Sequence, residues 1–332
     1  INDRSREGVI ILRTLTATMV ASMLLSGLVP AILFGAELHQ ESEADYLSEI
    51  DSVISATRIQ QPLTESPSSI TVINRDMIVA SGAVEIADVI RLVPGTQVGY
   101  AQGNQIAVTY HGYGDAFPRD MQILIDGRSV YQPSFADVDW LFMGIELEDI
   151  ERIEVIRGPN TPFYGSNAVA GVINIITRLP LQDRGTTARM TAGDLNTRHA
   201  VLRHGGRLGE LDYRVSLSHQ ENDGLEGNME ATNDSRDIQG ISLRSTWNPR
   251  PIDEVDIQLG FADGELGAGD GTEPVSLPQE KDVTSQYAHL SWRHTRNDNS
   301  ELRWQFYHNR YESNDSFRDL LSNSYGVSPD TI

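Results

Sequence analysis

The most informative segment of this chain lies near its middle and reads IERIEVIRGP over residues 150–159 and YGSNAVAGVINIIT over residues 164–177. In the first piece charged side chains alternate with apolar ones, which predicts a β-strand with one charged and one apolar face. The charged positions are Arg152, Glu154 and Arg157. The second piece ends in an aliphatic run that predicts another strand, and its glycines supply turns where a Cβ atom would clash.

Mixed helix and strand patterns surround this segment from residue 66 to residue 178. Asn74 can cap a helix that begins near Met77, and Gly82 can end it. A second amphipathic helix is predicted from Val84 to Leu92. Further strands are predicted at Ser69–Ile73, Ile106–Tyr110 and Met121–Ile125, the last followed by an Asp126-Gly127 turn. About 110 residues of this kind make one compact α+β domain.

From Gly185 onward the helix signals stop, and apolar residues alternate strictly with polar ones. The apolar positions of the clearest runs are Leu211, Tyr213, Val215 and Leu217; Val255, Ile257, Leu259 and Phe261; Ala288, Leu290 and Trp292; and Leu302, Trp304 and Phe306. The polar positions include charges, such as Asp212 and Arg214, that a sealed core would not hold. A barrel with lipid outside and water inside satisfies both faces, whereas a soluble β-sandwich is the alternative.

The connections between these runs favour the barrel, because short and long ones alternate as periplasmic turns and extracellular loops do, with one exception in the short outer connection Gly193–Arg198. The short ones are His204–Gly209, Asn248–Asp253 and Thr295–Ser300, and the long, acidic ones are Gln220–Asp237 and Gly264–Thr284. About seven strands are expected, too few to close a barrel around a domain of this size. We therefore expect a truncated chain in which residues 179–332 form the N-terminal part of a transmembrane β-barrel.

The N-terminus has the layout of a signal sequence, which we place at residues 1–36. Three arginines precede an uncharged aliphatic stretch from Thr14 to Ala36. A single transmembrane anchor is the alternative, since about 20 apolar residues span a bilayer. Residues 37–65 are expected to form a flexible periplasmic segment with a β-prone run at residues 51–58.

Composition excludes several classes of protein. The 332 residues carry a formal net charge of −21, which argues against a nucleic-acid partner. There is no cysteine, so disulfides, thiolate catalysis and cysteine-ligated metals are excluded. Mean hydropathy of −0.31 argues against a polytopic helical membrane protein. No nucleophile elbow, HExxH motif or telling carboxylate pair occurs, so we expect neither an enzyme nor a catalytic residue.

The segment at residues 150–177 closely resembles the end of the plug domain of TonB-dependent outer-membrane receptors. Supporting pieces occur in the family's order at Ser68–Ile73, Ile90–Gly95 and Leu124–Gly127. The resemblance implies an α+β plug domain at residues 66–178, followed by antiparallel transmembrane β-barrel strands that are incomplete in this chain. It also implies location in the cell outer membrane.

The same resemblance implies TonB-dependent active import of a scarce chelate. A ferric siderophore is the first expectation, and cobalamin, haem or another non-siderophore solute is the alternative. A passive barrel porin or an adhesin is the rival from a different class, although neither would need a plug. The expected partners are the energy-transducing protein TonB, outer-membrane lipid and a small-molecule chelate. No permanently bound cofactor or metal is expected, and the transported ligand is expected to be an iron chelate.

The resemblance finally assigns residues to roles. A TonB box is expected to pair with TonB by strand addition through Asp51, Ser52, Val53, Ile54, Ser55, Ala56 and Thr57. Outward plug loops are expected to contact ligand through Tyr100, Gln102, Asn104, Tyr131, Gln132 and Ser134, with ordinary polar loops as the alternative. Bonds from plug to barrel wall are expected from Arg152, Glu154 and Arg157. His111 stands where relatives often carry arginine, and a core or barrel contact is expected of it.

Overall fold

The structure is a computed structural model. Two β-rich regions follow one another along the chain. The structure describes residues 52–53, 55, 61–63, 66, 68–101, 104–112, 120–132, 137–165, 167–224, 233–268, 279–297, 300–319 and 324–331. The predicted signal sequence lies outside the described residues, as do Gln102, Ser134 and most of the predicted flexible segment.

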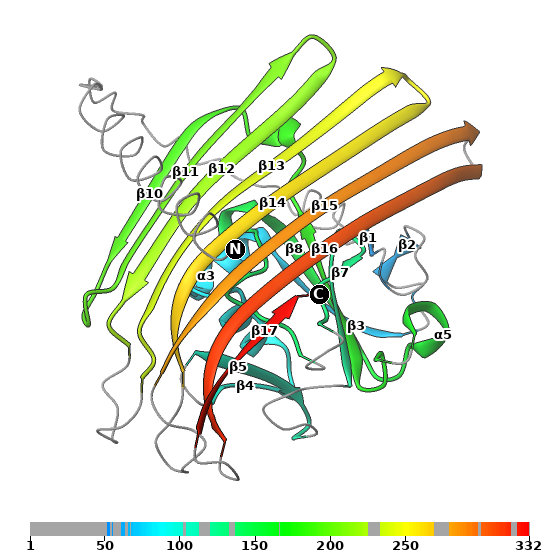
Figure 1. Ribbon diagram of the computed structural model, residues 1–332. Coiled ribbons are helices and arrows are strands. Elements are labelled where there is room, and N and C mark those ends of the chain that lie inside the picture. Colours follow the sequence, from blue (N-terminus) through cyan, green and yellow to red (C-terminus); the bar gives the residue numbers. More distant parts are fainter. Residues whose placement is uncertain are drawn as a thin grey trace. The chain divides into compact units, whose positions relative to one another are not determined.

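The first region, which we call the N-terminal domain (residues 68–183), is built on a five-stranded sheet (Figure 1). Its strands, in spatial order, are β3 (Ser69–Asn74), β8 (Ile150–Arg157), β9 (Gly171–Thr177), β6 (Met121–Ile125) and β7 (Arg128–Ser129). β9 pairs antiparallel with β8 and parallel with β6. The two strands predicted from the segment at residues 150–177 therefore lie next to each other in the middle of this sheet.

Helices and a hairpin complete the N-terminal domain. They are α3 (Arg75–Ser81), α4 (Ile86–Val89), η2 (Ile90–Leu92), β4 (Thr96–Ala101), β5 (Gln105–Tyr110), η3 (Leu147–Asp149), α5 (Thr161–Tyr164) and η4 (Pro180–Gln182). The core between them is aliphatic, and residues such as Ile73, Ile153, Ile173 and Ile175 have no exposed surface. Burial of such side chains is the main favourable contribution to the folding of the domain.

Local capping explains where the first helix begins and ends. The Asn74 side chain accepts a hydrogen bond from the Met77 backbone N at 2.9 Å, and Gly82 ends α3 with φ at 66°. Only the first residue was misplaced, since the helix begins at Arg75. The second predicted helix is wrong in extent, because α4 begins at Ile86 and tightens into a 3-10 turn at Ile90. The backbone oxygen of Ile90 accepts from the Thr96 hydroxyl at 2.7 Å, which holds this tightened turn.

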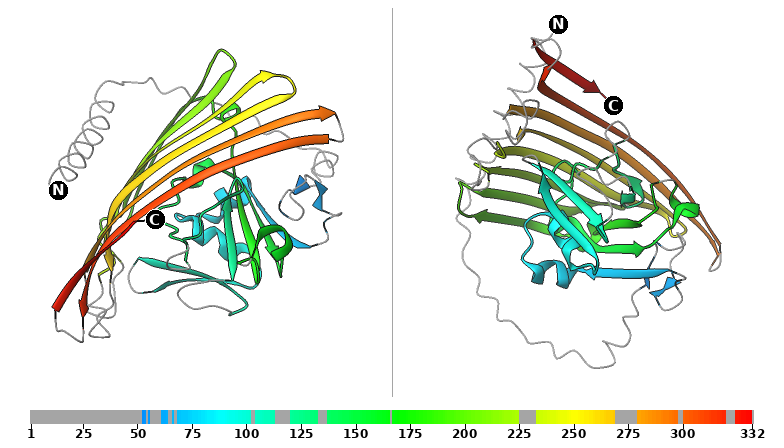
Figure 2. Two further views of the ribbon diagram at one scale, coloured as in Figure 1. Left: turned by 45° about the vertical axis from the view of Figure 1, so that its right-hand side comes forward. Right: turned by 90° about the horizontal axis from the view of Figure 1, so that it is seen from below.

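The second region, which we call the long sheet, has eight antiparallel strands in sequence order (Figure 1). They are β10 (Gly185–Ala192), β11 (Arg198–Leu208), β12 (Leu211–Asn222), β13 (Arg236–Arg250), β14 (Asp253–Ala268), β15 (Gln279–Asn297), β16 (Ser300–Asp319) and β17 (Ser324–Thr331). The predicted antiparallel strands are confirmed. Long connections follow β12 and β14 and alternate with tight turns after β11, β13 and β15, whereas the connection from β10 to β11 is short, as expected of the one exception. Figure 2 shows the sheet strongly curved, with the N-terminal domain against its concave face.

Two expectations about the long sheet are wrong. The polar segment near the C-terminus contains an eighth strand, β17, which pairs with the end of β16. The predicted long connection from Gly264 to Thr284 is also too long, since Gly264 pairs with Val283 and Ala268 with Gln279. Main-chain pairing extends these strands through a glycine-rich, acidic sequence that has no alternating pattern.

The two faces of the long sheet differ as predicted. Asp212, Arg214 and Ser216 of β12 are buried on the inner face, at 3–5% exposure. The outer face carries exposed apolar side chains, which include Trp247, Leu259, Leu290, Trp304 and Phe306. One cross-strand row on that face joins Trp247, Val255, Trp292 and Trp304. Such a band of aromatic and aliphatic side chains is suited to lipid. Among the described residues, no helix is both long and apolar enough to cross a membrane.

Candidate functional site

The candidate functional site is the contact between the N-terminal domain and the long sheet, where carboxylates of the domain meet arginines of the sheet. Arg214 of β12 binds Asp149 through Nε at 3.3 Å and Asp183 through Nη1 at 2.7 Å. Arg203 of β11 lies 3.5 Å from Asp149 and 3.7 Å from Asp183. All four side chains are at most 8% exposed. Charges buried this deeply are stable only when they are paired, so the cluster fixes the position of the domain.

A second buried cluster surrounds Asp126, in the turn between β6 and β7. Its carboxylate lies 3.4 Å from Arg244 Nη1 and accepts from the Gln258 amide at 2.9 Å and the Thr177 hydroxyl at 2.6 Å. Arg244 also binds Asp256 of the neighbouring strand at 2.9 Å and donates to the Thr177 hydroxyl. Burial alone would raise the pKa of Asp126, but Arg244 and the hydrogen bonds outweigh it and hold that pKa below its usual range.

A third group of contacts lies at the end of the long sheet that carries the long connections. Glu85 accepts from Arg236 Nη2 at 2.6 Å and from the Gln220 amide at 2.7 Å. The Asn104 amide donates to the backbone oxygens of Ser235 at 2.8 Å and of Gly267 at 3.0 Å. The hairpin of β4 and β5 is therefore hydrogen-bonded to the sheet at this rim.

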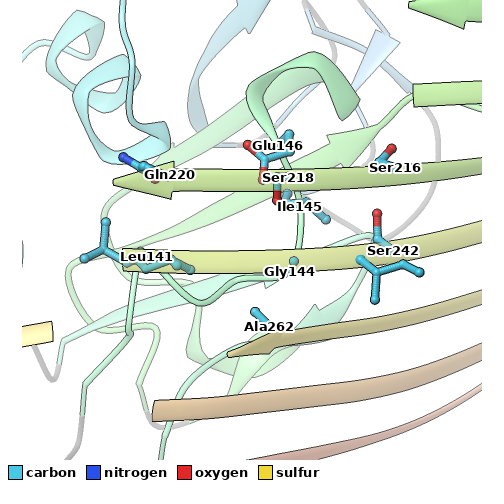
Figure 3. A pocket seen from close by; sticks show the side chains of 12 residues that line it. Leu141, Gly144, Ile145, Glu146, Ser216, Ser218, Gln220, Ser242 and Ala262 are labelled. Carbon is cyan, nitrogen blue, oxygen red and sulfur yellow. The ribbon is translucent and has the colours of Figure 1, made fainter. Parts of the chain in front are cut away.

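Apolar contacts and a small cavity lie between these polar groups. Phe142 packs with Ile238, Leu266, Val283 and Tyr311 of the long sheet. Beside it, a cavity of about 30 Å³ separates the segment around Gly144 from serines of neighbouring strands (Figure 3). The volume has room for water but not for an organic solute. The domain and the sheet are thus closely fitted here.

A larger cavity, of about 360 Å³, lies between β7, the segment that follows it, and strands β15 and β16. Two of the six predicted ligand residues, Tyr131 and Gln132, line it. Tyr100 lies elsewhere, on β4, and is 42% exposed. Asn104 is placed differently from the expectation, because its amide group is bonded to the long sheet. Beside the cavity, burial raises the pKa of Asp137 to about 6.

The predicted TonB-box segment is described at three positions. Ser52 and Val53 form β1, which pairs with β2 (Gln61–Pro62), and Val53 is fully buried. The Ser55 backbone N and hydroxyl both donate to Glu154, at 2.9 and 2.5 Å. Asp51, Ile54, Ala56 and Thr57 lie outside the described residues. The segment is thus docked on the N-terminal domain through Ser55.

The expected bonds from Arg152, Glu154 and Arg157 to the barrel wall need correction. Arg152 Nε donates to Glu154 at 2.8 Å, and Arg157 Nη2 donates to the Ser69 hydroxyl at 2.6 Å. Glu154 accepts from Ser55. These bonds lie within the N-terminal domain and its docked segment, because the charged side of β8 at residues 152–154 lies under Ser55.

His111 also differs from its expectation of a core or barrel contact. It is exposed, and its backbone has φ at 53°. Its backbone N donates to the Gly95 oxygen at 2.7 Å, and its ring packs edge-on against Tyr110. The residue therefore lies in the turn that follows β5, and its backbone hydrogen bond to Gly95 stabilises that turn.

Sequence reasoning missed the residues that do join the two regions. They are Glu85, Asp126, Asp149 and Asp183 on one side and Arg203, Arg214, Arg236 and Arg244 on the other. A signal was available, since four arginines occur within alternating strands whose polar side faces inward. The carboxylates lie in turns, at helix ends and in a linker. Acidic residues are common at such places, so these four could not be distinguished from other acidic residues in the sequence.

Comparison with known proteins gives one family and a consistent set of relatives. The family model described as the TonB-dependent Receptor Plug Domain matches residues 62–172. The vitamin B12 transporter BtuB of Photobacterium profundum is 34% identical over 184 residues, which are 54% of this chain and 27% of the relative. The ferric enterobactin receptor PirA of Pseudomonas aeruginosa is 29% identical over an alignment of 252 positions, which covers 66% of this chain and 33% of the relative. The chain thus spans about a third or less of these relatives.

Solved structures show the same fold. The ferric yersiniabactin uptake receptor FyuA from Yersinia pestis superimposes with a TM-score of 0.60 at 18% identity, over 75% of this chain and 42% of that one. The siderophore receptor PirA from Pseudomonas aeruginosa has a TM-score of 0.56 at 24% identity, over 76% and 42%. At these identities the likeness is one of fold, and it covers both the N-terminal domain and the long sheet.

Proposed function

We propose that this chain, whose residues 62–172 match the plug domain of TonB-dependent receptors, supplies the plug and the adjoining wall strands of an energy-coupled importer in the outer membrane. The cargo that we propose is a scarce chelate, with a ferric siderophore first and cobalamin as the alternative. Both classes are named among the relatives, in the ferric enterobactin receptor PirA and the vitamin B12 transporter BtuB.

The observation that carries the proposal is the way in which the plug is held against the wall. Its main aliphatic core lies within the N-terminal domain, whereas its contact with the long sheet combines buried ion pairs and cavities with one small apolar cluster around Phe142. Separating the two partners of an ion pair into water has a far lower net free-energy cost than opening a buried aliphatic core, because water solvates the separated charges. A domain fixed in this way can seal the wall and still move, which an importer requires and which a passive porin does not.

We propose that coupling to TonB uses Asp51–Thr57, by addition of an extended strand to the partner. Val53 is paired with Gln61, and Ser55 is bonded to Glu154. The segment must therefore leave these partners before it can pair with another chain. Ligand contacts from Tyr100, Tyr131 and Gln132 remain part of the proposal, together with Gln102 and Ser134.

Deletion of Asp51–Thr57 from the receptor that carries this chain tests the proposal. We expect binding of the cargo at the cell surface to persist and uptake to fall to the level of a strain without TonB. The measurement is accumulation of ⁵⁵Fe-labelled siderophores and of labelled cyanocobalamin, which also identifies the cargo class. A deletion of equal length, Glu43–Glu49, is the matched control. Unchanged uptake of every bound ligand after the first deletion would refute the proposal.

A further inference from the structure

One buried arginine of the plug differs from the arginines that hold the plug to the wall. Arg128 of β7 is 3% exposed, and its guanidinium lies 3.8 Å from the centroid of the Tyr287 ring. Nη1 donates to the Asn309 side chain at 3.0 Å, and Nη2 to the Met143 backbone oxygen at 3.5 Å. Its Nε is buried and has no hydrogen-bond partner. The cation is held by neutral groups.

Arg128 makes no ion pair among the described residues, whereas Arg203, Arg214, Arg236 and Arg244 each bind a carboxylate. The acidic groups around Arg128 are engaged elsewhere. Asp126 is bonded to Arg244, Gln258 and Thr177, and Asp139 accepts from the Tyr311 hydroxyl at 2.8 Å. Burial lowers the pKa of Arg128, as expected for a desolvated cation without a counter-charge. A buried charge in this condition has a strong tendency to bind an anion.

Arg128 also lines the cavity of about 360 Å³ between the plug and β15 and β16. This volume is at the lower end of the range for small-molecule sites, about 300–1,000 Å³. Tyr131, Gln132 and Asn309 add aromatic and amide surface to the lining, and Asp139 adds a carboxylate that is already hydrogen-bonded. The cavity is thus lined by a cation without a counter-ion and is large enough for a small organic acid.

We propose that this cavity binds the carboxylate group of an anionic solute, with Arg128 as the residue that recognises it. A guanidinium matches a carboxylate through parallel N–H donors, and the neutral groups around it position the rest of the solute. The inference deepens the proposed function, on which it rests, by assigning carboxylate-bearing chelates as the substrate class.

Binding of malonate to the purified receptor in detergent tests the inference, because malonate is a small dicarboxylate that fits the cavity. Its neutral isostere malonamide is the reference probe, and equilibrium dialysis with labelled compounds is the measurement. We expect malonate to bind at least tenfold more tightly than malonamide. Arg128→Gln should remove that preference, since a charge-assisted hydrogen bond corresponds to roughly a tenfold change or more.

Two further variants keep the test decisive. Arg293→Gln is the matched control, because Arg293 is paired with Glu254 on the long sheet and does not line the cavity. Ser285→Phe fills the cavity from the wall without removing a contact of Arg128, so it should abolish malonate binding even if Arg128→Gln fails to fold. Equal binding of malonate and malonamide by the unmodified receptor, or malonate binding that survives Ser285→Phe, would overturn the inference.

The two proposals fail in different ways. The binding assay needs no TonB, so loss of malonate selectivity with intact TonB-dependent uptake removes only the Arg128 site. If malonate binds selectively but deletion of residues 51–57 does not change uptake, the proposed function is refuted and the Arg128 site is retained.

Discussion

The inside of the plug and its contact with the long sheet use different physical chemistry. Inside, β-branched side chains such as Ile153, Ile173 and Ile175 pack without exposed surface. At the contact, Asp149 and Asp126 are bonded to Arg214 and Arg244. Aliphatic packing is non-directional, and its loss is costly. Ion pairs require alignment, and the cost of removing their charges from water offsets much of their electrostatic attraction. The difference suits the proposed function, in which the plug stays folded while its contact with the wall changes.

The largest expected effect comes from breaking the contact at one partner. Arg214→Ala leaves the buried Asp149 with Arg203 as its cationic partner and Asp183 with Arg203 and Arg178, and it should cost about 3–5 kcal/mol. The midpoint of urea-induced plug release, followed by hydrogen exchange of η3 and η4 beside Asp149 and Asp183, measures this loss. Arg184→Ala is the control, since Arg184 is 52% exposed and 3.5 Å from Asp212, and its loss should cost under about 0.5 kcal/mol. Similar values for both variants would contradict a paired cluster.

The next effect comes from opening the core of the plug. Ile173→Ala creates a cavity in the middle strand β9 and should cost about 2–5 kcal/mol. Unlike Arg214→Ala, it should increase hydrogen exchange inside the plug and leave the contacts of the long sheet intact. The same measurement therefore separates the two regions. Exchange that rises first at the contact would show that core and contact form one cooperative unit.

A smaller effect is expected at an exposed helix cap of the plug, which belongs neither to its core nor to its contact with the long sheet. Asn74→Ala removes the side chain that caps α3 and should cost about 1 kcal/mol. Asn74→Ser keeps an oxygen acceptor and should recover most of that loss. Urea unfolding of the two variants checks the comparison, and equal stability of alanine and serine would mean that the cap contributes nothing.

Acid should weaken the contact through Asp126. Its pKa in the folded protein lies below the unfolded value of about 3.9, so the stability it provides is present above that value and is lost as pH falls through the lower folded pKa. Asp126→Asn should remove this acid dependence of plug release. Acid titration of the hydrogen exchange of β6 and β9 is the measurement, and an unaltered titration in the variant would contradict the role of Asp126.

Asp137 should respond with the opposite sign. Burial raises its folded pKa to about 6, so stability falls as pH rises from about 4 to about 6, where the unfolded state loses a proton first. Asp137→Asn should therefore stabilise the plug modestly at pH 7 and have no effect at pH 4. Urea midpoints at the two pH values test this, and equal stabilisation at both would refute it.

The sequence by itself was sufficient for features whose causes are local or periodic. Alternation marks the strands and assigns each side chain to a face, and Asn74 and Gly82 mark the ends of a helix. Period and composition also predicted the α+β domain followed by antiparallel strands. These properties depend on neighbours in the chain, so no knowledge of the fold was needed.

Only the tertiary structure decided which charges meet. Arg244 and Asp126 are 118 positions apart, and Glu154 and Ser55 are 99 apart. Alternation shows that Arg214 faces inward and that Glu154 lies on a charged face, but not what lies opposite either of them. The curvature of the long sheet places Arg214 over Asp149, and the docked segment places Ser55 over Glu154. Partners of this kind depend on register and distance in three dimensions, which a one-dimensional pattern does not contain.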